Sequence, residues 1–287
     1  MNNESAKIII PPIKIQGIKS KLVPWIQDVM ETSDISYEGC WIEPFMGSGV
    51  VGFNAGRSLN RHLMCDTNPH IVRFYEDLRD KVVNDWTVRQ ALESHDQLLK
   101  MDGEAYYYRV REWFNRFHSP MTSFLFLSRA CFNGLMRFNS KGEFNVPFCK
   151  KTERFSKAYI TKICNQVKAV GEIVRSGDWE FCCQDFRLTI KSAQPNDFIY
   201  CDPPYFGRHV DYYNGWTEKD EEELFNLLSQ TPAKFILSTW HHNDYRENEM
   251  ISKFWNHFNI TIREHFYHIG ASETNRRGVT EALITNF

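Results

Sequence analysis

Asp202, Pro203, Pro204 and Tyr205 follow directly after the apolar run 198–201. Proline has no backbone N–H and fixes its own φ, and the residue before a proline is held extended. These residues therefore predict a stiff loop at the end of a buried strand. A carboxylate and a fixed proline carbonyl can accept both hydrogens of an exocyclic amino group, and a tyrosine ring offers a stacking face for a base. An ordinary strand-ending turn is the alternative for this tetrapeptide alone.

Small residues lie at 47–49, within the segment EPFMGSG (43–49). Gly47 and Gly49 let a ligand approach the backbone closely where a strand passes into a helix. The segment is not GxGxxG, which disfavours a dinucleotide-dependent oxidoreductase. Asp66 ends the next expected strand, and an acid about 20 residues beyond such glycines can bond ribose hydroxyls. A capping or turn aspartate is the alternative interpretation of Asp66.

Asp185 and Phe186 close a third strand-like run, at 179–186. An acid there can accept the amino hydrogens of an adenine, with the phenylalanine ring beside the base. This pair alone is weak evidence for such a site. Ligands of open α/β sheets do bind at the carboxyl ends of the strands, however, and all three acids are expected at that edge.

The outer parts of the chain alternate between strand-like and helix-like segments, as in an α/β protein. A glycine turn entering a helix is expected at 46–56, and Thr217 and Asp220 have the spacing of a capping box. Helices are expected at 18–30 and 218–230, and strands at 39–45, 61–68, 179–186, 197–205, 233–240, 264–270 and 281–287.

The middle of the chain, from 71 to 175, is mostly helical by pattern and rich in aromatic and basic residues. We therefore predict a catalytic domain from 1–70 and 178–287, with 71–177 as an inserted second domain. The net charge is −2, so any nucleic-acid surface must be a local patch. The stretch 137–157 holds six basic and two acidic residues, which fits phosphate contacts or else a solvated charged face.

The remaining composition excludes several classes of protein. Eight cysteines without a CxxC pair fit reduced thiols in a cytoplasmic protein. His241–His242 and the pair His265 and His268 lack further ligands at metal-site spacing, so no metal is expected. No apolar run approaches the length of a membrane span, and the first residues lack the apolar segment of a signal peptide.

In the order of its motifs the chain resembles the Dam-like (D12 class, alpha group) DNA adenine-N6 methyltransferases. The glycine motif comes first, then a long insertion, then DPPY, and the resemblance covers nearly the whole chain. The insertion carries CFNGLMRFNSKGEFNVPF (131–148), which is very similar to the family's signature. Four segments further resemble the EcoRV-type modification methylases: PPIKIQGIKSKLVPWI (11–26), WIEPFMGSGVVGFN (41–54), GRHVDYYN (207–214) and STWHHNDYREN (238–248).

This resemblance implies a Rossmann-like methyltransferase sheet with a helical DNA-recognition insertion. It implies S-adenosylmethionine as cofactor, duplex DNA as partner and flipping of the target adenine. The EcoRV-type segments imply methylation within GATATC as the modification enzyme of a restriction system, whose endonuclease acts without a stable complex. A monomer is the expected state.

The family's motifs carry over residue by residue. Lys19 matches the last lysine of Lys-Trp-x-Gly-Gly-Lys, whereas Ile15 and Ile18 replace its tryptophan and second glycine, which removes an aromatic cofactor contact. The other matches are Phe45, Gly47 and Gly49 for the glycine motif, Asp66 for ribose, Asp185 and Phe186 for adenine, and Asp202, Pro203, Pro204 and Tyr205 for catalysis, with Asp202 also at the cofactor.

The insertion supplies the expected DNA contacts. Phe132, Asn133 and Arg137 match positions that contact or wedge into DNA in the Dam branch, and Lys141 adds a phosphate contact. Arginine suits bidentate pairing with guanine, and an aromatic ring can fill the stack when a base leaves it. Core packing is the alternative for Phe132. His209 is expected over the flipped base or at the DNA, with a purely structural role as its alternative.

Two groups of rival functions stay open. One keeps the chemistry and changes the acceptor to cytosine N4, an RNA adenine or a protein glutamine. The other is a catalytically inactive protein of the same fold that only binds a DNA site. The acids at 66, 185 and 202 argue against the inactive protein.

Overall fold

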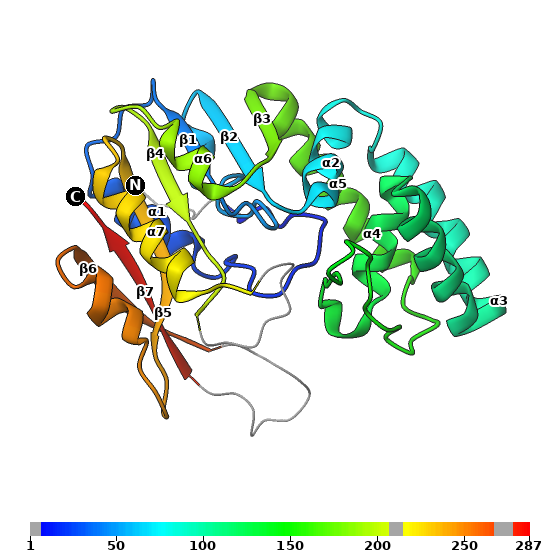
Figure 1. The fold of residues 1–287 in the computed structure, drawn as a ribbon. Helices are drawn as coiled ribbons and strands as arrows, with labels where there is room; N and C mark the ends of the chain where they lie inside the picture. Colours follow the sequence, from blue (N-terminus) through cyan, green and yellow to red (C-terminus); the bar gives the residue numbers. More distant parts are fainter. Residues whose placement is uncertain (1–6, 207–214, 267–277) are drawn as a thin grey trace.

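The computed structural model describes residues 7–206, 215–266 and 278–287 (Figure 1). Within these residues one seven-stranded sheet has the order β3-β2-β1-β4-β5-β7-β6. The first five strands in this order pair in parallel, and β7 is antiparallel to both of its neighbours. The predicted Rossmann-like α/β fold is confirmed. The strands are β1 (Cys40–Glu43), β2 (Arg61–Asp66), β3 (Asp178–Cys183), β4 (Phe198–Cys201), β5 (Lys234–His242), β6 (Asn259–Phe266) and β7 (Gly278–Thr285).

The strand order reverses between β1 and β4. From β1 the chain moves outward through β2 to β3, and from β4 it moves outward in the other direction to β5. Connections leave in opposite directions at such a point, so a crevice forms beyond the carboxyl ends of the two strands. Glu43 is the last residue of β1, and Asp202 follows β4 directly. Both acids therefore reach the same crevice.

The two central strands are buried on both faces, so they read in the sequence as apolar runs, with Glu43 at the end of β1 as the exception. Their side chains alternate between two cores. Trp41, Phe198 and Tyr200 face a core that includes α1 (Val23–Glu31). Ile42 and Ile199 face a second core that includes α6 (Phe186–Lys191) and α7 (Glu218–Gln230).

The middle of the chain forms α2 (Pro69–Arg79), α3 (Asp85–Phe117), α4 (Met121–Ala130) and α5 (Lys157–Ser176). Asn68 and Asn84 cap the first two of these helices with their side chains. α2 contacts β2 and β3, and α5 contacts β3, whereas α3 packs on α4 and α5. Figure 1 accordingly shows α3 and α4 lying to the side of the sheet, beyond its β3 edge.

Some expected elements differ from the observed ones. Residues 46–55 form a series of turns followed by η1 (Gly56–Ser58), and the helix expected at 46–56 was wrong. Asn54 donates from Nδ2 to the carbonyls of Val50 and Ile9, at 2.7 and 2.9 Å, so its side chain competes for backbone partners. The capping box of Thr217 and Asp220 is confirmed. Of the strand expected at 264–270, residues 264–266 belong to β6 and the rest lie outside the described residues.

Three further observations concern the classes considered from composition. All eight cysteines are free thiols. No helix in the described part of the chain has the length and apolar character needed to cross a bilayer. Across the same residues, no three His, Cys, Asp or Glu side chains gather as they would around a metal ion.

Candidate active site

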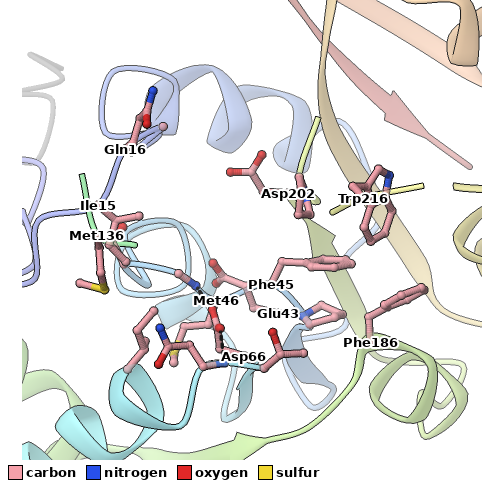
Figure 2. Close-up of a pocket in the computed structure, with 18 of the residues that line it drawn as sticks. Ile15, Gln16, Glu43, Phe45, Met46, Asp66, Met136, Phe186, Asp202 and Trp216 are labelled. Carbon is pink, nitrogen blue, oxygen red and sulfur yellow. Dashed lines mark hydrogen bonds between the residues drawn. The ribbon is translucent and has the colours of Figure 1, made fainter. Parts of the chain in front are cut away.

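A pocket opens at the crevice between β1 and β4, and the strand ends and the helical segment both contribute to it (Figure 2). Figure 2 shows Phe45, Phe186 and Trp216 gathered at one side of the pocket and Ile15 with Met136 at the other. Predicted site residues that line the pocket are Lys19, Phe45, Gly47, Asp66, Arg137, Asp185, Phe186, Asp202 and Pro204.

The glycine turn after β1 is tied to the end of β2. Gly47 and Gly49 have φ values of +50° and +70°, in the left-handed region that favours glycine. The Gly47 N–H donates to Asp66 Oδ2 at 2.8 Å, and the Asn68 N–H donates to Oδ1 at 2.8 Å. A Cβ added at Gly47 would meet no protein atom within 4 Å. At Gly47 the turn therefore presents bare backbone to open space. The Asp66 carboxyl itself is buried, and burial raises its pKa.

Asp202 is paired with a buried lysine. Lys19 Nζ lies 2.9 Å from Asp202 Oδ1 and also donates to Tyr205 Oη at 2.8 Å. Only 4% of Lys19 is exposed, so its charge is directed at these two partners. Burial raises the pKa of Asp202, and the ammonium group of Lys19 opposes that shift. The structure thus joins the Lys19 and Asp202 motifs, which lie far apart in the sequence.

Asp185 and Phe186 stand at the start of α6. Asp185 caps that helix by accepting the Arg187 N–H at 2.9 Å, and its carboxylate also pairs with the Arg187 guanidinium at 3.0 Å. Arg187 binds Asp220 at 2.6 Å as well, and it contacts Glu223. The Phe186 ring stacks on Phe45 at 5.3 Å. The sequence interpretation did not foresee Arg187, which holds Asp185 in place at the pocket wall.

Trp216 is a pocket residue that the sequence interpretation missed. Its ring packs edge-on against Phe45 at 5.6 Å and at a tilt against Phe186 at 5.5 Å. Its indole N–H donates to the buried Glu221 carboxylate at 2.6 Å, and Trp255 donates to the same group at 2.9 Å. Burial raises the pKa of Glu221, while both indoles oppose the rise. The only signal in the sequence is an aromatic residue placed just before the capping box of α7.

Glu43 is a second missed residue. It ends β1, lines the pocket and is 2% exposed. Burial raises the pKa of its carboxyl to about 8, although the Trp41 indole donates to Oε2 at 3.1 Å and opposes the rise. An acid at the end of a fully apolar strand was the available signal. With Asp66 and Asp202 it makes one wall of the pocket rich in carboxyl groups.

The family model for D12 class N6 adenine-specific DNA methyltransferases matches residues 16–269. The chain belongs to this family. The predicted resemblance to the D12 class is therefore confirmed, over most of the chain.

Three relatives show how far the similarity extends. The chain is 26% identical over 290 residues to the type II methyltransferase M.FokI of Planomicrobium okeanokoites, covering 96% of this chain and 42% of that protein. It is 33% identical to the DNA adenine methylase of Haemophilus influenzae, covering 68% of this chain and 63% of the relative. It is 32% identical to the DNA adenine methylase of Serratia marcescens, covering 76% of this chain and 77% of that relative. The chain thus spans less than two thirds of the first two relatives.

The signature loop of this D12-family chain, residues 131–148, follows α4 in the helical segment. Two isolated bridges, Cys131 with Phe148 and Phe138 with Phe144, close it on buried side chains. Phe132 lies at the base of this loop, where its N–H donates to the Pro147 carbonyl at 2.8 Å, and it is 49% exposed, so the structure does not place it in the core. Arg137 lines the pocket and donates from Nε to Asn145 Oδ1 at 3.0 Å.

The other predicted DNA contacts are at the surface or beyond the described residues. Asn133 is exposed with φ of +53°, and Lys141 is exposed on the far turn of the same loop. His209 lies outside the described residues.

Proposed function

We propose that this chain transfers a methyl group from S-adenosylmethionine to N6 of adenine in duplex DNA, with the base rotated out of the helix. The observation that carries the proposal is the pairing of Asp202 with buried Lys19 at the crevice between β1 and β4. Family membership supports the same reaction. The chemistry then depends on where the pocket places the cofactor and the base.

The residues that line the pocket support S-adenosylmethionine as its ligand. Bare backbone at Gly47 gives a ligand close access, and Asp66 beside it can accept ribose hydroxyls. Asp185 and the rings around it suit the amino edge and faces of adenine. The Asp202 carboxylate suits a cationic ligand. When bound, S-adenosylmethionine supplies an electrophilic methyl group on a sulfonium centre.

Asp202 is proposed to orient the amino group of the target base. Its carboxylate and the Pro203 carbonyl accept the two N6 hydrogens, which leaves the nitrogen lone pair less delocalised into the ring. Tyr205 offers the face on which the base stacks. A carboxylate is too weak a base to deprotonate a neutral amine, so the proton leaves after the new N–C bond forms. Most of the catalysis is positioning and local charge.

Trp216 is proposed to close the adenine end of the cofactor pocket. Trp216→Ala is expected to raise the Kd for S-adenosylhomocysteine about 10-fold, since an aromatic contact with a base stabilises binding by about 1–3 kcal/mol. Isothermal titration calorimetry measures this directly. Trp216→Phe keeps a ring at the position, so its loss of binding free energy should be about half that of Trp216→Ala or less. An unchanged Kd in Trp216→Ala would remove Trp216 from the cofactor site.

We propose residues 71–177 as the target-recognition domain. Phe132, which is exposed, is proposed to fill the space left by the flipped base, and Asn133 follows it in the sequence. Arg137, at the boundary of pocket and loop, is proposed for a base edge, and Lys141 for a phosphate. His209 remains a proposed DNA contact on sequence grounds alone. A monomer suits an enzyme that modifies one strand in each encounter.

The proposed site is GATATC, and the proposed role is modification within a restriction system. The site rests on the likeness of four sequence segments to EcoRV-type methylases. The role is supported by similarity to a protein named as a type II methyltransferase. A cognate endonuclease would act on the same site without a stable complex.

The specificity is tested with labelled S-adenosylmethionine and two duplexes, one containing GATATC and one with that site scrambled. Incorporation only into the first is the expected result. Incorporation into both would discard GATATC and keep the chemistry. No incorporation with cofactor binding intact would point to another site or to RNA, and no cofactor binding would favour the inactive DNA-binding protein.

A further inference from the structure

Glu281 is a charged residue inside the apolar strand β7, with sequence GVTEALIT. It is fully buried, with 0% of the residue exposed. In register it lies opposite Trp240 of β5 and Arg263 of β6. Burying a carboxylate costs free energy unless it is hydrogen-bonded or paired, so its partners define its role.

One of these partners is the tyrosine of the DPPY motif. Tyr205 Oη donates its hydrogen to Glu281 Oε2 at 2.8 Å. Tyr205 Oη in turn accepts a hydrogen from Lys19 Nζ, also at 2.8 Å. Because Lys19 pairs with Asp202 at 2.9 Å, an unbroken polar chain runs from β7 to Asp202. Glu281, Tyr205, Lys19 and Asp202 thus form one connected polar network.

We propose that Glu281 is a positioning residue for methyl transfer, which fixes the Tyr205 ring and the Lys19 charge beside Asp202; this rests on the proposed function. A phenol held at its hydroxyl by a donor and an acceptor loses freedom to rotate. The orientation of the ring then sets the orientation of a base stacked on it. Lys19 Nζ also lies 4.9 Å from the centre of that ring, so the ammonium group contacts both the hydroxyl and the ring of Tyr205.

Electrostatics connects Glu281 to Asp202 as well. The negative charge of Glu281 contributes to raising the pKa of Asp202, after burial as the largest cause and against the effect of Lys19. An ionised Asp202 accepts with both oxygens, one toward Lys19 and one toward the amino group, whereas protonation turns one of these oxygens into a donor. Glu281 therefore influences the pH range in which Asp202 works, through space and through the intervening Tyr205 and Lys19.

Two substitutions separate the charge of Glu281 from its hydrogen bond. Glu281→Gln keeps an acceptor for Tyr205 and removes the charge, whereas Glu281→Met removes both at similar volume. Glu281→Met is expected to lower the single-turnover rate of methyl transfer about 100-fold, as for a small misplacement of reacting groups. Its Kd for S-adenosylhomocysteine should stay within about 3-fold of the wild type, a free-energy change of under about 1 kcal/mol. Glu281→Gln is expected to lose about 10-fold or less in rate.

The pH profile gives a readout that loss of structure alone does not move. Both substitutions should shift the acid limb of the rate to lower pH, because the charge that raises the pKa of Asp202 is gone. Adding Tyr205→Phe to Glu281→Met should lower the rate above the acid limb little more than Tyr205→Phe alone, since Glu281 positions the ring through that hydroxyl. Thr285→Val, four residues further along β7, is the matched control and should keep the wild-type rate and acid limb.

Several outcomes would overturn the role of Glu281. One is a rate and an acid limb equal to those of the wild type in both Glu281→Gln and Glu281→Met. Another is a double variant, Glu281→Met with Tyr205→Phe, whose loss of rate is the full sum of the two single losses on a free-energy scale. If Glu281→Met does not fold, the acid limb of Glu281→Gln decides the question, and an unshifted limb overturns the proposal. An inactive wild-type protein on every DNA tested is a different result, because it rejects the proposed function itself.

Discussion

Asp202→Ala is expected to lower methyl transfer to duplex DNA about 1000-fold or more, while DNA affinity changes little. Asp202 is the acceptor that orients the amino nitrogen, and it lines the cofactor pocket, whereas the proposed DNA contacts Phe132, Asn133 and Lys141 are exposed on the loop 131–148. Substitution therefore removes an interaction with the reacting group and leaves the proposed DNA surface intact. Single-turnover rates with labelled cofactor, beside fluorescence anisotropy on a labelled duplex, measure the two quantities.

Asp202→Asn is the matched control, because it keeps the shape and one acceptor while introducing a donor toward the amine. It should be nearly as inactive as Asp202→Ala, since a donor cannot pair with the N6 hydrogens. Substantial activity in Asp202→Ala would contradict the role of Asp202 in orienting the amino group. Loss of DNA affinity equal to the loss of rate would make Asp202 a binding residue instead.

Lys19→Met is expected to slow methyl transfer about 100-fold or more and to move the acid limb of the rate to higher pH. Lys19 is the cation paired with Asp202, and it opposes the effects of burial and of Glu281 on the pKa of that carboxyl. Without it the pKa of Asp202 rises further above the ordinary value of about 3.9. Asp202 is then protonated over a wider range, and a protonated carboxyl is a poorer acceptor.

The control for Lys19→Met is Lys19→Arg, which keeps the charge and should leave the acid limb close to the wild type. Its rate should still fall, because a planar guanidinium does not reproduce the geometry of an ammonium group between Asp202 and Tyr205. The shift of the acid limb in Lys19→Met has the opposite direction to the shift expected for Glu281→Gln. An acid limb that does not move in Lys19→Met would contradict the electrostatic account of the site.

Much of the site could be predicted because its residues end strands. Asp66 and Asp202 follow apolar runs, and parallel strands bring their carboxyl ends to one edge. The capping box of Thr217 and Asp220 is a local signal that needs no tertiary contact. These features depend on spacing along the chain, which the sequence displays directly.

The missed features depend on contacts between distant segments. Trp216 reaches the pocket because buried Glu221 holds its indole, and Glu281 matters because its strand brings it to Tyr205. Arg187 gathers carboxylates from α6 and α7 that lie more than 30 residues apart. The helix expected at 46–56 does not form for the same kind of reason. The Asn54 side chain donates to the Val50 carbonyl in its own turn and to the carbonyl of the distant Ile9. Local propensity does not reveal such partners.

The most direct test of the proposed reaction is to identify the methylated nucleoside. Unmethylated DNA of random sequence that includes GATATC is incubated with the protein and S-adenosylmethionine, digested to nucleosides and analysed by mass spectrometry, with Asp202→Ala treated in parallel. N6-methyladenine in the wild-type sample and none above background with Asp202→Ala is the predicted result. N4-methylcytosine, or no methylated nucleoside from a protein that binds the cofactor, would contradict adenine N6 in DNA as the acceptor.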